Sequence, residues 1–250
     1  MCNGETGQTI DIVEDRKLVS LLKYFTYYSF NARKRVKFII IDMYSPYVSL
    51  IQKMFPNTQI IIDTFHLIQL ISRSLNKIRI FAMKNNKSAY NKMKKYWKLI
   101  LKDRNELDYS KWKRYTCFPN LMTEIDVVNY ILDQSVELKA TYYKYQELLQ
   151  SIKEKNYDAF IYAITNVNNS VSDYMKTSIK TLIEVKDKIY NTFNNNYHNG
   201  YIEGNNNFIK VLKRIAFGFR SFRRFKARIM ICKGLVKINI KKADAFASAS

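Results

Sequence analysis

The sequence predicts an α/β fold with a large all-helical insertion. Short runs of β-branched residues alternate with helical patterns over the first quarter of the chain, which is the order expected for adjacent parallel strands. From residue 67 to residue 193 the apolar spacing is helical. Only six glycines and three prolines are present. The 250 residues, 47% of them hydrophobic, suffice for one medium domain or for one domain with an insertion, and they exclude a disordered chain.

Three strands are predicted, at residues 9–13, 36–41 and 59–62. The first run alternates only in part, the second is almost entirely apolar, and the third is β-branched. Continuous runs of this kind are typical of strands that are buried on both faces of a sheet. Helical spacing fills the intervals at 18–28 and 48–55, so the expected order is strand, helix, strand, helix, strand.

Further helical patterns follow, and the basic segment 84–102 also contains several aromatic residues. Asparagine-rich sequence near residue 195 predicts a loop, after which a last long helix begins near Tyr201 and is broken near Gly218. We therefore divide the chain into a strand and helix portion (1–66), a helical insertion (67–193), a basic helical segment (194–242) and a flexible tail (243–250).

The charge of the chain predicts a polyanionic partner. Lysine and arginine number 42 against 21 acidic residues, a net charge of +21. Residues 198–242 hold twelve of these cations and one acid, Glu203, whereas residues 1–66 hold eight cations and six acids. Such an asymmetry indicates a binding surface in the C-terminal segment. Nucleic acid is the usual partner of such a surface, and an anionic membrane is the less common one.

Cysteine usage and hydropathy bear on the cellular compartment. The three cysteines, Cys2, Cys117 and Cys232, lie far apart, which argues against a disulfide framework or a cysteine zinc site. The mean hydropathy is −0.30, and no uncharged apolar run reaches the roughly 18 residues of a membrane span. The first ten residues lack the pattern of a signal peptide. We therefore expect a cytoplasmic protein without a membrane partner.

Two aspartates follow the predicted strands directly. Asp42 comes after the run at 36–41, and Asp63 comes after the run at 59–62. Functional carboxylates in α/β proteins lie at the carboxyl ends of parallel strands, although aspartate also serves there as a helix cap or turn former. His66 stands three residues after Asp63, where it would either form a structural hydrogen bond or support a site. With two histidines in the chain, a metal cage built from histidine is not expected.

The helix that begins near Tyr201 has two distinct faces. Its apolar face is predicted to pack against the core, which disfavours a membrane-surface helix. Another face carries one carboxylate, one amide and two cations: Glu203, Asn207, Lys210 and Arg214. A carboxylate can hold a metal ion while amides and cations hold phosphates or bases; the alternative is a solvated polar face. The apolar face consists of Phe208, Val211, Leu212 and Ile215.

Aromatic and basic residues interleave over 217–228. This pattern suits stacking and phosphate contacts on single-stranded or distorted nucleic acid, and it equally suits a helix with phenylalanine inside and arginine outside. The candidate DNA contacts are Asn207, Lys210, Lys213, Arg214, Arg220, Arg223, Arg224 and Arg228.

Together these segments resemble the ISL3-type insertion-sequence transposases, a family of DDE transposases. The matching stretches are 36–79 and 198–229, with a weaker one at 10–25. They carry the motifs D-M-Y-S-P-Y, F-P-N and D-T-F-H, followed by E-G-N-N-N-F-I-K and G-F-R-S-F. Each motif alone is weak evidence, but the set in this order is specific.

The resemblance implies an RNase H-like catalytic core in which residues 194–242 complete the sheet-bearing part. Asp42 matches the second catalytic aspartate and Glu203 the catalytic glutamate, while Asp63 and His66 match a motif that supports the site. In the family three such carboxylates hold two Mg²⁺ (or Mn²⁺) ions, and the substrate is DNA at the transposon ends. A homo-oligomer is left open.

The family's first catalytic aspartate would precede residue 1, as would its zinc-binding and helix-turn-helix region. We therefore expect a truncated transposase that binds metal weakly and cleaves little DNA alone, while its basic surface still binds DNA. The alternative is a non-catalytic, basic nucleic-acid-binding protein in which the aspartates and Glu203 are structural.

Overall fold

The computed structural model describes residues 1–197 and 199–235, which are mostly helical with two small sheets. The described residues form two compact units: one is Arg33–Asn196, and the other joins Met1–Ala32 to residues 197 and 199–235. The strands are β1 (Phe38–Ile41), β2 (Gln59–Ile62), β3 (Lys113–Arg114) and β4 (Leu121–Met122). The helices are α1 (Leu18–Thr26), α2 (Phe30–Lys34), α3 (Ser45–Met54), α4 (Thr64–Asn85), α5 (Tyr90–Lys95), α6 (Trp97–Leu101), the 3₁₀ helix η1 (Arg104–Glu106), α7 (Glu124–Leu132), α8 (Val136–Lys153), α9 (Tyr157–Thr165), α10 (Asp173–Glu184), α11 (Lys186–Phe193), α12 (Gly200–Ile215) and α13 (Phe222–Cys232).

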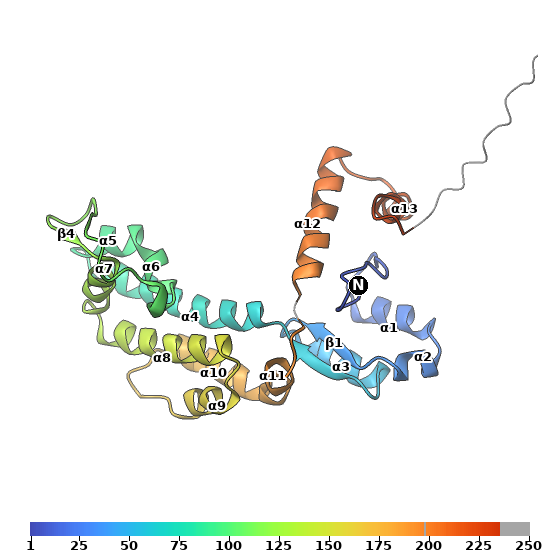
Figure 1. Cartoon of the computed structure of the whole chain (residues 1–250), viewed down its shortest axis with the longest axis horizontal. Coiled ribbons are helices and arrows are strands. Elements are labelled where there is room, and N and C mark those ends of the chain that lie inside the picture. The colour runs from blue at the N-terminus through green and yellow to red at the C-terminus, as the bar shows by residue number, and fades with distance from the viewer. Residues whose placement is uncertain (198, 236–250) are drawn as a thin grey trace, which may run out of the picture. The chain divides into compact units, whose positions relative to one another are not determined.

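A parallel pair of strands forms one end of the larger unit. β1 pairs with β2 in the register that places Ile41 opposite Ile62, and α3 provides the crossover between them (Figure 1). Ile61 and Ile62 are fully buried, as the β-branched pattern predicts. The strands predicted at 36–41 and 59–62 are therefore confirmed, the first of them two residues shorter than expected.

The strand predicted at residues 9–13 is wrong. Within the described residues this segment forms only an isolated antiparallel bridge, between Thr9 and Cys2. Ile10 is 56% exposed, so its apolar side chain does not pack as a strand residue would. The carboxylate of Asp11 instead accepts a hydrogen bond from Tyr24 and pairs with Lys226. Backbone bonds to Met1, such as the one from the N–H of Ile10 at 2.9 Å, and the side-chain contacts of Asp11 therefore hold this segment.

The edge of β2 that faces away from β1 is covered by side chains of α11. The hydroxyl of Thr192 accepts a hydrogen bond from the N–H of Ile62 at 2.9 Å and donates to the carbonyl oxygen of the same residue at 2.9 Å. The amide of Asn191 donates to the carbonyl of Ile60 at 3.1 Å. Because these bonds satisfy backbone groups that a neighbouring strand would otherwise satisfy, α11 takes the place of a third strand at this edge.

Replacing Thr192 with valine should lower the free energy of unfolding by about 1–3 kcal/mol, since the buried N–H of Ile62 loses its acceptor while the side-chain shape is kept. Urea denaturation followed by circular dichroism measures the change. Thr177→Val is the matched control, because the Thr177 hydroxyl is exposed and donates only to a carbonyl of its own helix. Equal losses in both variants would contradict a role for Thr192 at the strand edge.

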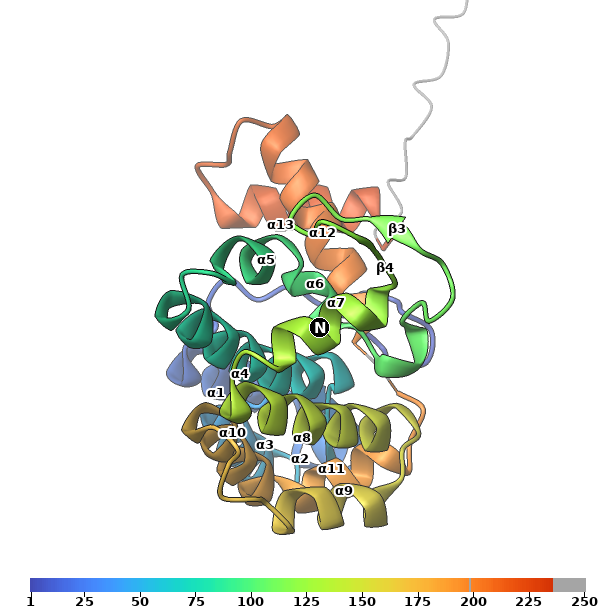
Figure 2. The ribbon, with the colours of Figure 1, turned by 90° about the vertical axis from the view of Figure 1, so that its left-hand side faces the viewer.

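The helical part of the larger unit packs around α4, which runs from the sheet to α5 and α6 (Figures 1 and 2). Its apolar side chains Leu67, Ile71 and Leu75 are fully buried, which fits the helical spacing predicted from residue 67 onward. The insertion predicted at 67–193 is not helical throughout, because β3 and β4 form a short antiparallel hairpin before α7. Two-residue strands leave no periodicity to detect, which explains why the pattern did not predict them. The predicted domain boundaries stay predictions.

The smaller unit contains the N-terminal segment, α1, α12 and α13. Close approach explains Gly7, where a Cβ atom would lie 2.4 Å from the ring of Tyr201. The buried amide of Asn205 donates to the sulfur of Cys2 at 2.9 Å. The predicted break near Gly218 is confirmed, since α12 ends at Ile215 and α13 begins four residues after Gly218. The tail predicted at 243–250 lies outside the described residues.

The apolar face of α12 does not pack as expected. Leu212 is buried, but Val211 is 46% and Ile215 64% exposed, and Phe208 is half-buried. The prediction that all four pack against the core is therefore wrong. Periodicity shows which side of a helix is apolar, but it does not show whether another element covers that side.

Candidate functional site

Asp42 lies at the carboxyl end of β1, in the turn that leads into α3. Its Oδ1 accepts a hydrogen bond from the N–H of Tyr44 at 3.2 Å, and the residue is half-buried. The N–H of Asp63 donates to the carbonyl of Ile41 at 3.0 Å, which continues the β1–β2 register by one residue. Both aspartates therefore stand at the same end of neighbouring parallel strands, where α/β sheets place their sites.

The Asp63 carboxylate is buried without a hydrogen bond. The residue is 4% exposed, and its Oδ2 has no hydrogen-bond partner within the described part of the chain. Its neighbour His66 places Nε2 at 3.9 Å from this oxygen, beyond hydrogen-bond distance. Asp63 precedes α4, but its side chain makes no capping bond. A helix-capping role therefore does not explain Asp63. The hydrogen bond that Asp42 accepts from Tyr44, in contrast, is one that a turn-forming aspartate makes.

Glu203 belongs to the other unit, in the first turn of α12. Its side chain is exposed, and a carboxylate there is favoured by the positive end of the helix dipole. A Cβ atom added to the adjacent Gly204 would meet nothing within 4 Å, so no close packing accounts for that glycine among the described residues. Space for a side chain therefore remains at Gly204, the residue next to Glu203.

The predicted DNA contacts are all exposed. They lie on α12, on α13 and in the loop between these helices. Within residues 1–197 and 199–235, none of the seven cations among them lies within 4.0 Å of a carboxylate. We call this set the basic surface: Asn207, Lys210, Lys213, Arg214, Arg220, Arg223, Arg224 and Arg228.

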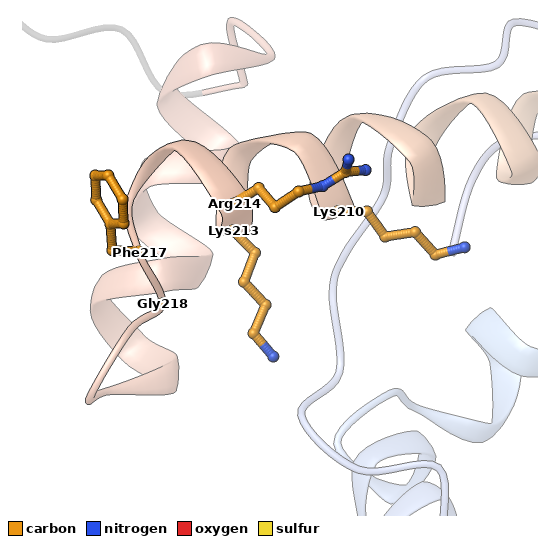
Figure 3. Close-up of a pocket in the computed structure, with 5 residues that line it drawn as sticks. All are labelled: Lys210, Lys213, Arg214, Phe217 and Gly218. Atoms are coloured by element: carbon orange, nitrogen blue, oxygen red, sulfur yellow. The ribbon is translucent and has the colours of Figure 1, made fainter.

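Three members of the basic surface line one open concavity of about 500 Å³ at the end of α12. Lys210, Lys213 and Arg214 line it together with Phe217 and Gly218, and in the view of Figure 3 the Phe217 ring points away from the Lys210 and Arg214 side chains. Phe217, which the sequence pattern alone does not single out, is fully exposed. Cations beside an exposed aromatic ring are the side chains that contact phosphates and bases of single-stranded nucleic acid.

Lys226 is the cation of α13 that does have an acidic partner. Its Nζ lies 2.5 Å from Oδ1 of Asp11, whose Oδ2 accepts a hydrogen bond from Tyr24. Burial raises the pKa of the Asp11 carboxyl, but the bonds from Lys226 and Tyr24 outweigh burial and hold that pKa below its usual value. Lys226 therefore attaches α13 to the N-terminal segment and leaves the arginines of this helix for other contacts.

Carboxylate oxygens are the ligands that Mg²⁺ prefers, so Asp42 and Glu203 suit that ion chemically. Within the described parts of the two units, no three acidic, histidine or cysteine side chains form a metal-binding group.

Comparison with known families decides what the chain is related to. The model of the ISL3-type DDE transposases, described as a transposase, matches residues 1–229. The chain belongs to this family. The resemblance carried by the motifs at 36–79 and 198–229 is thereby confirmed.

This member of the ISL3 family also resembles a protein of Lactococcus lactis subsp. lactis named "ATP-dependent protease". The two are 42% identical over 113 residues, which is 45% of this chain and 36% of that protein. No solved structure matches. None of the described helices combines the length and the apolar character that crossing a membrane would require.

Proposed function

We propose that this chain acts in DNA transposition as the catalytic part of a DDE transposase with an RNase H-like core. The position of Asp42 carries the proposal: a carboxylate at the carboxyl end of a parallel strand, beside Asp63, inside the segment that matches the family. The basic surface supports it, because its unpaired cations fit a polyanionic substrate. The substrate would be DNA at the ends of an insertion sequence.

In this proposal Asp42 and Glu203 would hold Mg²⁺ or Mn²⁺. Such ions activate a water or 3′-hydroxyl oxygen and stabilise the leaving oxygen of a phosphodiester. The basic surface would bind and orient the DNA backbone beside these two carboxylates. Asp63 and His66 would support the position of Asp42, and no residue of this chain is assigned to the first of the family's three acids.

The proposal requires the two carboxylates to lie within roughly 4–8 Å of each other, as ligands of one metal pair do. A double-cysteine variant, Asp42→Cys with Glu203→Cys, tests this distance after the three native cysteines, which are free, are replaced by serine. We expect a short bifunctional maleimide to join residues 42 and 203 within one chain, detected as a linked peptide by mass spectrometry.

The control for this experiment pairs Asp42→Cys with Asn129→Cys. Asn129 is exposed on α7, at the far end of the helical part from β1 (Figure 1). Cross-linking of the control pair alone, or of neither pair, would contradict a shared metal site. Either result would favour the alternative function, that of a basic nucleic-acid-binding protein without catalysis.

Removal of two cations from the basic surface should weaken DNA binding and its dependence on salt. For Lys210→Ala with Arg214→Ala, we expect the slope of log K against log salt to fall by about 2, since each lost phosphate contact removes about 0.9. Fluorescence anisotropy with a labelled duplex at several salt concentrations measures the slope. Lys180→Ala with Lys186→Ala, two exposed cations of the helical part, is the control. Equal slopes in all three proteins would argue against this surface.

The name of the Lactococcus lactis relative supports no second function here. The match covers 36% of that protein, so its proteolytic and ATP-dependent activity cannot be assigned to the shared 113 residues.

A further inference from the structure

Phe217 is the most exposed large apolar side chain in the described part of the molecule. Its relative accessibility is 101%, so its ring makes almost no contact with the rest of the chain. An isolated exposed phenylalanine gains no burial energy in folding. Packing therefore does not explain why an aromatic residue occupies this position.

The backbone at Phe217 disfavours a side chain of this kind. α12 ends in a Schellman turn, in which the N–H of Phe217 donates to the carbonyl of Arg214 and the N–H of Gly218 to that of Lys213, both at 3.0 Å. Phe217 has a φ of 51°, the left-handed region in which glycine is the usual residue. The turn itself would thus be more stable with glycine, and strain of this kind is commonly found at functional sites.

The surroundings of the ring indicate what it would contact. Phe217 borders the concavity lined by Lys210, Lys213 and Arg214, whose cationic groups have no acidic partner among the described residues (Figure 3). A nucleotide has a π-face and a phosphate, and an aromatic ring beside cations is complementary to both. In a fully paired duplex the bases are stacked inside, so the ring can reach only an unpaired or displaced base.

We propose that Phe217 stacks on an unpaired base of DNA whose flanking phosphates contact Lys210, Lys213 and Arg214. The inference rests on the proposed function, because it assumes that the basic surface binds DNA. It adds a preference for DNA that contains an unpaired segment over continuous duplex. The turn at the end of α12 presents the ring to that segment.

The test compares two DNA substrates with the full chain. One is a continuous labelled duplex, and the other is the same duplex with a short single-stranded gap. For Phe217→Ala we expect the affinity for gapped DNA to fall about 5- to 150-fold, the loss of one stacked base, while the affinity for duplex changes less than twofold. Phe217→Trp should retain the preference. A 2-aminopurine base placed in the gap should be quenched by the native chain and not by Phe217→Ala.

Two controls separate stacking from a structural role. Phe217→Gly should lose the same preference while the melting temperature rises or stays unchanged, because glycine relieves the left-handed backbone. Phe81→Ala, which removes an aromatic side chain 51% exposed on α4, should leave both affinities unchanged. A lower melting temperature for Phe217→Gly would show that the ring supports the fold.

The outcomes also distinguish this inference from the proposed function. If Phe217→Ala binds both substrates as tightly as the native chain, or loses affinity equally for both, base stacking is refuted. The DNA-binding surface still stands in that case if Lys210→Ala with Arg214→Ala weakens binding. If Phe217→Ala changes only the mass of the protein in solution, the ring binds a second copy of the chain, and the inference is wrong. Absence of DNA binding by the native chain would overturn both.

Discussion

In a full-length transposase that supplies the first catalytic acid, replacing Asp42 with asparagine is expected to abolish Mg²⁺-dependent cleavage and joining of DNA that carries insertion-sequence ends. The amide keeps the size of the side chain and can still accept the hydrogen bond from Tyr44, but it lacks the charge that a cation ligand needs. Since loss of one preorganised electrostatic group costs about 10²–10³ in rate, loss of a metal ligand should cost at least that much. Gel analysis of cleaved and joined strands measures the change.

DNA binding provides the internal reference for this variant. Asp42 does not belong to the basic surface, so the dissociation constant of Asp42→Asn for DNA should stay within about twofold of the native value. Glu203→Gln should lose activity to a similar extent, and the double variant should be no worse than either single one, because ligands of one metal pair act as a unit. Asp158→Asn, a change of an exposed carboxylate on α9, is the control and should be active. Retained strand transfer in Asp42→Asn would remove this residue from the active site.

The parallel strands and the basic helices could be predicted because their sequences carry local information. The runs before Asp42 and Asp63 are long enough and apolar enough to specify buried strands, and residues 201–228 combine helical spacing with a strong excess of charge. The position of both aspartates at one end of the sheet then follows from parallel pairing alone. This part of the candidate site therefore needs no coordinates.

The remainder depends on contacts between distant segments, which no local pattern encodes. The sequence around Thr192 predicts only a helix. Its hydroxyl nevertheless forms hydrogen bonds with the N–H and the carbonyl of Ile62, 130 residues away. The segment at 9–13 has strand-like composition, but its partners are residues 1 and 2 and the side chains of Tyr24 and Lys226, not a neighbouring strand. Exposure of Val211 and Ile215 likewise depends on which elements cover α12, not on the sequence of α12.

The buried carboxylate of Asp63 indicates a conflict between stability and activity. Asp63 is 4% exposed, and its Oδ2 has no hydrogen bond among the described residues. A buried charged oxygen of this kind destabilises the folded chain. Such a residue is retained when the charge is needed for function, and its position beside Asp42 suggests that need. Stability and catalysis should therefore respond in opposite directions when the charge is removed.

For Asp63→Asn we expect the free energy of unfolding to rise by roughly 1–2 kcal/mol, because a buried amide is less costly than a buried charge without a hydrogen bond. The melting temperature should then rise by about 2–4 °C for each kcal/mol. In the full-length transposase, strand transfer should fall by about 10- to 100-fold, the usual effect of removing a group that positions a metal ligand. Asp42→Asn is the matched comparison, since its half-buried carboxylate already accepts a hydrogen bond and its removal should not stabilise the fold. Loss of stability in Asp63→Asn would mean that His66, whose Nε2 lies 3.9 Å from the Asp63 Oδ2, compensates the buried charge, and the conflict inferred from this oxygen would not exist.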